Sequence, residues 1–281
     1  MRKPINKTRD GKVILITGAS SGLGKSCAEL LLERGHTVYG TSRSARILDN
    51  SSDPGSIKMI PMNVDDEISV ARAIAHVIDD AGVLHVIVNN AGYGIAGSIE
   101  DTTVEEAKAL FETNFFGIHR VCRTALPYLR EQGFGHIINI GSMGGVAAIP
   151  FQAFYSASKS ALASLTDGLS MELKPFGISV TRVEPGDYRT EFTSNRVFVK
   201  AADPAGVYGE RCSRAIAVME HGEREGADPE DMASILVKVI ESKHPALNYR
   251  VGLLMQKFLI GLVPFLPDRV VEKLLMSNYK I

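Results

Sequence analysis

Six short apolar or β-branched runs recur between residues 12 and 184, and longer amphipathic segments separate them. This alternation is typical of a parallel sheet with helices on both faces, because two parallel strands need a long crossover between them. The sequence therefore predicts a doubly wound α/β fold. The expected strands are 12–17, 36–41, 56–61, 83–89, 135–141 and 178–184.

Helix ends are marked by aspartate and glycine. Asp65 and Asp66 can cap a helix whose apolar residues share one face, and Gly82 can end it. Gly35 likewise is expected to end the helix after the first strand.

The chain is expected to form a single domain over residues 1–281, because no repeat, low-complexity tract or linker interrupts its first 186 residues. The cofactor-binding and catalytic core is expected at 12–186. Later insertions in such a sheet can cover a ligand at the carboxyl ends of the strands. The segments expected after the core are a substrate lid (187–227), a capped helix (228 to about 243), a short strand (248–251) and an apolar C-terminal tail (253–281).

Composition favours a small-molecule partner. The 281 residues carry 31 Lys and Arg against 32 Asp and Glu, a formal charge of -1 that gives no general attraction to nucleic acid or anionic membrane. The longest apolar run, 258–266, is far shorter than the ~20 residues that span a bilayer. The basic N-terminus precedes a strand-like run and not a signal peptide. Three cysteines without a CxxC pair fit a reduced compartment, so we expect a cytoplasmic protein.

A glycine-rich turn, residues 17–26, follows the first strand and opens a helix. Gly18, Gly22 and Gly24 would allow a tight turn and close approach of a pyrophosphate to the helix N-terminus. The alternative is the phosphate loop of a nucleoside triphosphatase, because Gly24 is followed by Lys and Ser. That motif needs a glycine where Ala19 stands.

Several further motifs follow this turn in order, and with them the chain resembles the short-chain dehydrogenase/reductase family over about residues 12–190. The resemblance implies a Rossmann-like sheet, a nicotinamide cofactor and a catalytic set of Asn114, Ser142, Tyr155 and Lys159. Local similarity to members that act on retinoids and steroids favours a lipophilic alcohol or carbonyl substrate. The matching residues are Thr17, Gly18, Gly22, Gly24, Asn89, Asn90, Ala91, Gly92, Asn114, Ser142, Tyr155, Lys159, Pro185, Gly186 and Thr190.

Residue chemistry agrees with these roles. Tyr155 and Lys159 are four positions apart in an expected helix and would share a face. A tyrosine has a pKa of about 10, and lowering it to about 7 takes roughly 4 kcal/mol, which a nearby ammonium and an oxidised nicotinamide would favour. Ser142 would donate to the substrate oxygen, Lys159 would also bind the ribose, and the family role of Asn114 is to hold a water. The plainer alternatives are a surface Tyr–Lys pair, a turn serine and a packed asparagine.

Two other enzyme classes find less support. A serine hydrolase elbow around Ser142 would need glycine where Ile140 stands. The seven histidines show no metal-binding pattern, so no catalytic metal is expected.

NADP(H) is expected over NAD(H). The second strand leads into Ser42 and Arg43, the first acid after it is Asp49, and Arg43 could pair with a 2′-phosphate while Ser42 and Ser21 add hydroxyl donors. The alternative for Arg43 is a solvated loop side chain. Asn63 differs from the aspartate usual in the family. The expected cofactor-binding residues are Gly18, Ser20, Ser21, Gly22, Leu23, Gly24, Ser42, Arg43, Asn63, Val64, Asn90, Ala91, Gly92, Tyr155, Lys159, Pro185, Gly186 and Thr190.

The late segments are expected to build an apolar pocket. Phe192, Val197, Phe198 and Val199 would line the lid. The tail from Leu253 to Leu266 could line the pocket, pack against the core or a subunit, or touch a membrane. The resemblance implies a homodimer or homotetramer. A catalytically idle NADP-binding sensor remains an alternative to an enzyme.

Overall fold

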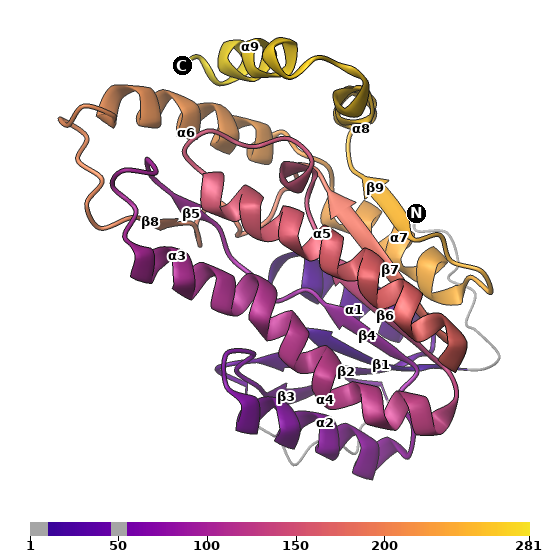
Figure 1. The fold of residues 1–281 in the computed structure, drawn as a ribbon. Coiled ribbons are helices and arrows are strands. Elements are labelled where there is room, and N and C mark those ends of the chain that lie inside the picture. Colours follow the sequence, from indigo (N-terminus) through magenta and orange to yellow (C-terminus); the bar gives the residue numbers. More distant parts are fainter. Residues whose placement is uncertain (1–10, 46–54) are drawn as a thin grey trace.

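The computed structural model describes residues 11–45 and 55–281. Asp49 and the basic N-terminal ten residues lie outside these ranges. Seven parallel strands form one sheet in the order β3-β2-β1-β4-β6-β7-β9, as Figure 1 shows, so the predicted Rossmann-like fold is confirmed. The strands are β1 (Val13–Thr17), β2 (Thr37–Ser42), β3 (Lys58–Pro61), β4 (Val86–Asn89), β6 (Gly135–Ile140), β7 (Ile178–Pro185) and β9 (Asn248–Val251).

Helices cover both faces of this sheet. Side chains alternate along each strand, so Leu15 of β1 packs on one face and Ile14 and Ile16 on the other. The first face is covered by α2 (Glu67–Ala81), α4 (Gly117–Gln132) and α5 (Ala153–Leu173), and the second by α1 (Gly22–Glu33) and α7 (Pro229–Glu241). The remaining helical elements are α3 (Val104–Phe111), the π-helical turn η1 (Glu112–Phe116), the 3₁₀ turns Met143–Gly145, Lys174–Phe176 and Val263–Phe265, α6 (Gly209–Arg224), α8 (Leu254–Leu262) and α9 (Asp268–Tyr279).

The predicted helix ends lie close to the observed ones. Asp66 caps α2 by accepting a hydrogen bond from the Ser69 N–H at 2.9 Å, and Gly82 ends the helix in the left-handed conformation. Gly35, with φ of +91°, follows the C-cap residue of α1. Asp65 does not cap; its side chain accepts a hydrogen bond from Thr113.

Residues 187–227, which we expected to form a lid, have more secondary structure than the sequence pattern indicated. The 16-residue helix α6 was not predicted, because only a few of its positions are buried and its N-cap residue Tyr208 makes no side-chain cap. The segment also adds the short strand β8 (Val197–Phe198), which pairs with β5 (Ile95–Ala96). Both lie at the end of the molecule where the strands of the main sheet finish (Figure 1).

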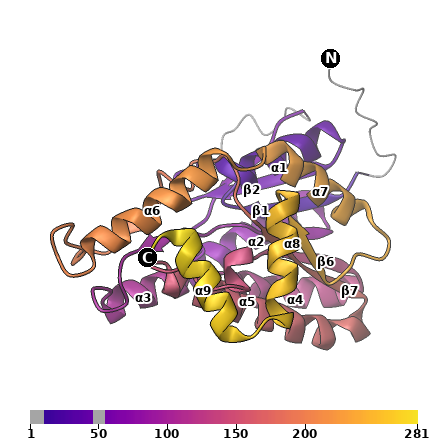
Figure 2. The same cartoon turned by 90° about the horizontal axis from the view of Figure 1, so that it is seen from above.

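The C-terminal tail folds into α8 and α9, which lie across the top of the molecule (Figure 2). Tyr279 and Ile281 pack with Ala215 and Met219 of α6, while Leu254, Phe258 and Phe265 are exposed. The tail therefore packs in part against α6 and leaves other apolar side chains uncovered. Within residues 11–45 and 55–281, no helix combines the length and apolar character needed to cross a bilayer.

A buried chain of polar groups fixes α5 over the sheet. Asn89 of β4 donates to Asn139 of β6 at 2.8 Å, Asn139 donates to Thr166 of α5 at 3.0 Å, and Thr166 donates to the Leu162 carbonyl at 2.7 Å. Each hydrogen bond satisfies a group that burial would otherwise leave unpaired. Helix α5 is thereby held in one register against the strands.

Replacing Asn139 with Ala should lower the free energy of unfolding by about 2–4 kcal/mol, because Thr166 and Asn89 both lose a buried partner. Urea unfolding measures this loss. Asn278→Ala, the same change at an exposed position of α9, is the control. Equal, small losses in the two variants would contradict a structural role for the buried chain.

Candidate active site

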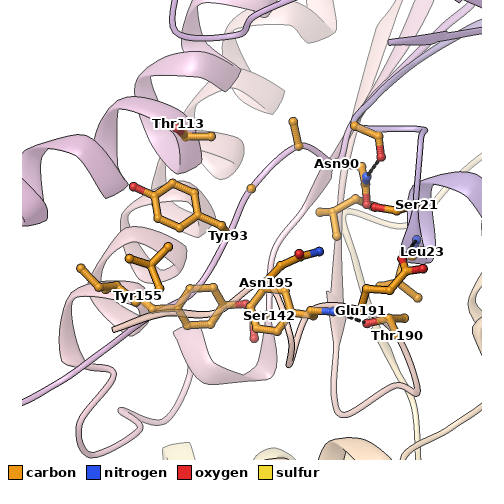
Figure 3. Close-up of a pocket in the computed structure, with 18 of the residues that line it drawn as sticks. Ser21, Leu23, Asn90, Tyr93, Thr113, Ser142, Tyr155, Thr190, Glu191 and Asn195 are labelled. Atoms are coloured by element: carbon orange, nitrogen blue, oxygen red, sulfur yellow. Dashed lines mark hydrogen bonds between the residues drawn. The ribbon is translucent and has the colours of Figure 1, made fainter. Parts of the chain in front are cut away.

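A cavity of about 980 Å³ lies at the carboxyl ends of the central strands. Figure 3 shows that its lining brings together the glycine-rich turn, Ser142 and Tyr155. Gly24 and Asn114 are the two predicted site residues that do not line it. Those that do are Gly18, Ser20, Ser21, Gly22, Leu23, Ser42, Arg43, Asn63, Val64, Asn90, Ala91, Gly92, Ser142, Tyr155, Lys159, Pro185, Gly186 and Thr190.

The glycine-rich turn presents the N-terminus of α1 to the cavity. Gly18 and Gly22 have φ of +67° and +54°, which favours glycine at both positions. The Gly22 N–H donates to a carboxylate oxygen of Glu191 at 3.1 Å. An anion therefore already sits at this helix end, where the partial positive charge of the helix favours negative groups. The turn fits the diphosphate of a dinucleotide.

Gly24 has a packing role instead. A Cβ atom at this position would lie 2.3 Å from the Gly18 carbonyl oxygen and 2.4 Å from the Asn90 side-chain nitrogen. The Asn90 amide donates to the carbonyl oxygens of Thr17 and Gly18, both at 3.0 Å. Together these contacts keep α1 close to β1 and hold the turn in shape.

Tyr155 lies in the first turn of α5 and is 8% exposed. Its ring contacts that of Phe192, with centroids 5.7 Å apart. The pKa of Tyr155 is raised to about 12, mainly by burial; the carboxylates of Glu223 and Asp187 add to the rise, while a hydrogen bond with Ser142 and the charge of Arg196 act in the opposite direction. Ser142 accepts a hydrogen bond from the Gly144 N–H at 3.0 Å, so its own hydroxyl proton can be donated.

Lys159 is buried one turn beyond Tyr155, and its Nζ lies 5.9 Å from the Tyr155 ring centroid. The ammonium donates to the Ile140 carbonyl oxygen at 2.9 Å. Burial lowers the pKa of Lys159 to about 8. The protein groups taken together raise the pKa of Tyr155, and the lowering that we expected from Lys159 with an oxidised nicotinamide stays a prediction. These groups thus favour the neutral phenol, which can donate a proton.

Asn114 lies behind the cavity in the π-helical turn η1. Its side chain accepts from the Tyr93 N–H at 3.0 Å and donates to the Tyr93 carbonyl at 2.9 Å. A Cβ atom on Gly92 would lie 2.9 Å from its oxygen and 3.7 Å from Lys159 Nζ. Asn114 therefore braces the loop after β4 beside Lys159. Its expected water-holding role stays a prediction.

Comparison with known proteins agrees with this geometry. The family model described as short chain dehydrogenase matches residues 12–198. The chain belongs to this family. It is similar to a 3-ketodihydrosphingosine reductase from Bacteroides thetaiotaomicron, with 40% identity over 96% of this chain and 98% of the relative.

Solved structures place the chain in the same family. A short-chain dehydrogenase from Streptomyces avermitilis superposes with a TM-score of 0.81 at 33% identity, covering 98% of this chain and 100% of the other. A 3-ketoacyl-(acyl-carrier-protein) reductase from Brucella melitensis, complexed with NADH, shares the fold with a TM-score of 0.72 at 24% identity, covering 87% and 98%. Other structures of this fold were solved with NADP.

Several residues that line the cavity were not predicted from the sequence. Asp187 lies within the Pro185–Thr190 motif and Glu191 directly follows it, so both could have been found from that motif alone. Glu223 lies on α6, which was not predicted, so nothing placed it near the site. The residues concerned are Tyr93, Thr113, Gln152, Asp187, Glu191, Asn195 and Glu223.

The predicted apolar lining is partly correct. Phe192, Val197 and Phe198 line the cavity. Val199 does not, because it turns inward and packs against Ile95 and Tyr155. No tail residue from 253 to 281 is among the described residues of the lining.

The Glu191 carboxylate accepts a hydrogen bond from the Gly22 N–H, a donor that a cofactor diphosphate would also use. Replacing Glu191 with Gln should therefore tighten NADPH binding by about 2–5-fold, the usual weight of one charge at a helix terminus. Fluorescence titration gives the Kd. Glu29→Gln, the same change on the exposed side of α1, is the control. Unchanged or weaker binding by the Glu191 variant would show that this carboxylate does not compete with the diphosphate.

Proposed function

We propose that the protein is an NADP(H)-dependent reductase that converts a lipophilic ketone to an alcohol, with Tyr155 as the proton donor. The observation that carries this proposal is the common cavity of Tyr155, Ser142, Lys159 and the glycine-rich turn. Family membership makes the protein an oxidoreductase of the short-chain dehydrogenase type. Neither a phosphate-loop triphosphatase nor a serine hydrolase accounts for this set of residues.

The chain's own residues would handle the substrate oxygen and its proton. The bound cofactor supplies the hydride that adds to the carbonyl carbon. Ser142 donates a hydrogen bond to the carbonyl oxygen and polarises it. Tyr155 gives its phenolic proton to the same oxygen, since its raised pKa keeps it protonated. Lys159, held at the Ile140 carbonyl, stabilises the phenolate that results.

A long-chain ketone is the substrate class we propose. The relative that is 40% identical over nearly the whole chain is a 3-ketodihydrosphingosine reductase, and its named substrate is a long-chain ketone with an amino group beside the carbonyl. Phe192, Val197, Phe198 and Ile149 give the cavity an apolar side. Burying a methylene of an alkyl chain against such side chains stabilises the complex by about 0.8 kcal/mol.

The preference for NADP(H) rests on Arg43. This exposed side chain lines the cavity just after β2, as do Ser42 and Ser21. A guanidinium pairs well with a phosphate, and it offers no acceptor to a ribose 2′-hydroxyl.

An idle NADP-binding sensor is the alternative, and it would bind the cofactor without turnover. The cytoplasmic location and the homodimeric or homotetrameric state both stay predictions. Following NADPH absorbance with a series of long-chain ketones separates enzyme from sensor.

Replacing Tyr155 with Phe should lower the rate of ketone reduction by about 10²–10⁴-fold, because only the proton donor is lost. The contact with Phe192 and the affinity for NADPH should remain. Tyr128→Phe, on the exposed face of α4, is the matched control. A Tyr155 variant with near-normal turnover would refute this role.

Replacing Arg43 with Ala should weaken NADPH binding by about 10–100-fold, the weight of one charge-assisted hydrogen bond, and change NADH binding little. Titration with each cofactor measures the two Kd values. Arg72→Ala, at an exposed position of α2, controls for the lost charge. Equal weakening of both cofactors would place Arg43 away from the 2′-phosphate.

A further inference from the structure

Two carboxylates face the substrate end of the cavity. Asp187 follows the Pro185–Gly186 pair at the end of β7, and Glu223 lies in the last turn of α6. Both line the cavity together with Tyr155 and Ser142. A Cβ atom on Gly222 would lie 2.9 Å from an Asp187 oxygen, so the Asp187 carboxylate lies directly against α6.

Only one of these two acids has an ion-pair partner in the described part of the chain. Arg196, which is buried and does not line the cavity, forms an ion pair with Glu223. Thr193 also donates to Glu223, at 2.5 Å. Glu223 is therefore neutralised from the protein side. Among the described residues, Asp187 has no ion-pair partner, so the group of three carries one uncompensated negative charge.

The position of Asp187 is fixed by a neutral side chain from the tail. Gln256 of α8 donates to an Asp187 oxygen at 2.5 Å and accepts from the Asp187 N–H at 3.2 Å. The Asp187 carbonyl oxygen accepts from the Ala227 N–H at 2.9 Å. An amide can orient a carboxylate without cancelling its charge, which leaves the second oxygen for another donor.

Burying the Asp187 carboxylate without an ion-pair partner costs free energy in the protein without substrate. Burial raises the pKa of Asp187, and the Gln256 hydrogen bond and Arg196 only oppose that effect. A cation that enters the cavity would remove the penalty, because a buried charge becomes favourable when it is paired and hydrogen-bonded. Both carboxylates also raise the pKa of Tyr155, so their charge acts at the reacting end of the cavity.

We propose that Asp187 binds the ammonium group of an α-amino ketone whose carbonyl oxygen lies at Tyr155 and Ser142, with Gln256 as its positioning residue. This assignment rests on the proposed ketone reduction and makes it specific. An amino group beside the carbonyl is the chemistry that a single uncompensated carboxylate in the same cavity as the phenol would recognise. The apolar side chains Phe192 and Phe198 are then left for the alkyl chain.

The test compares two ketones of equal chain length, 3-ketodihydrosphingosine and its analogue without the amino group. The wild-type protein should reduce the amino ketone with a kcat/KM about 10–100-fold higher, the usual effect of one charge-assisted hydrogen bond. Asp187→Asn keeps the shape and the contact with Gln256 but removes the charge. It should remove most of the preference for the amino ketone, since an effect of the lost charge on Tyr155 changes both rates alike and leaves the ratio of the two kcat/KM values unaffected.

Two further variants separate recognition from stability. Asp268→Asn, the same change on the exposed first turn of α9, should leave both substrates unaffected. Gln256→Ala should lower the ratio of the two kcat/KM values without abolishing reduction of the analogue. Loosening of the tail alone would instead lower both kcat/KM values and leave their ratio unchanged. If Asp187→Asn does not fold, the wild-type ratio together with that of Gln256→Ala decides the question.

The outcomes distinguish this proposal from the one it rests on. Equal rates of the wild-type protein on the two ketones, or equal losses on both in the Asp187 variant, would overturn the amine site while ketone reduction stands. Reduction of neither ketone by a folded wild-type protein that binds NADPH would overturn the proposed function itself.

Discussion

Burial of the Lys159 ammonium is the constraint on which the site depends. A buried cation needs a hydrogen-bond acceptor, and the Ile140 carbonyl at the end of β6 supplies it. That contact ties α5 to the strand end from which Ser142 follows two residues later. Gly145 permits the close approach, because a Cβ atom there would lie 2.9 Å from the Lys159 carbonyl carbon. The spacing of Tyr155 and Ser142 follows from these two contacts and from the polar chain beneath α5.

The cavity is electrostatically divided. Its cofactor end offers the N-terminus of α1 and the Arg43 guanidinium, both suited to phosphate groups, and also carries the Glu191 carboxylate at the Gly22 N–H. Its substrate end carries the Asp187 and Glu223 carboxylates, and Arg196 forms an ion pair with Glu223. Tyr155 lies where the two parts meet, and burial there keeps it a neutral acid. An anionic cofactor and a cationic substrate would thus be drawn to opposite ends with the reacting groups between them.

The parts of the fold and of the site that could be predicted from the sequence are those with local signals. Strand periodicity, Asp66 and Gly82 indicated elements that the structure contains, because each acts within a few residues of chain. The glycine-rich turn, Ser142, Tyr155 and Lys159 were found through spacing, and the fold brings them together. Helix α6 gave only a weak apolar pattern, so Glu223 could not be placed.

Contacts between residues far apart in the chain could not be predicted, because the sequence signals act only over a few residues. Gln256 meets Asp187 across 69 residues, and no local pattern encodes such a pair. Burial also raises the pKa of Tyr155, and no local pattern in the sequence indicated how deeply this side chain is buried.

Transfer of deuterium tests the central claim most directly. The protein would be incubated with 3-ketodihydrosphingosine and NADPH that carries deuterium at both C4 positions of the nicotinamide, and the alcohol product analysed by mass spectrometry. The account predicts an alcohol with one deuterium on the former carbonyl carbon. A folded protein that binds NADPH but yields no deuterated alcohol would contradict it.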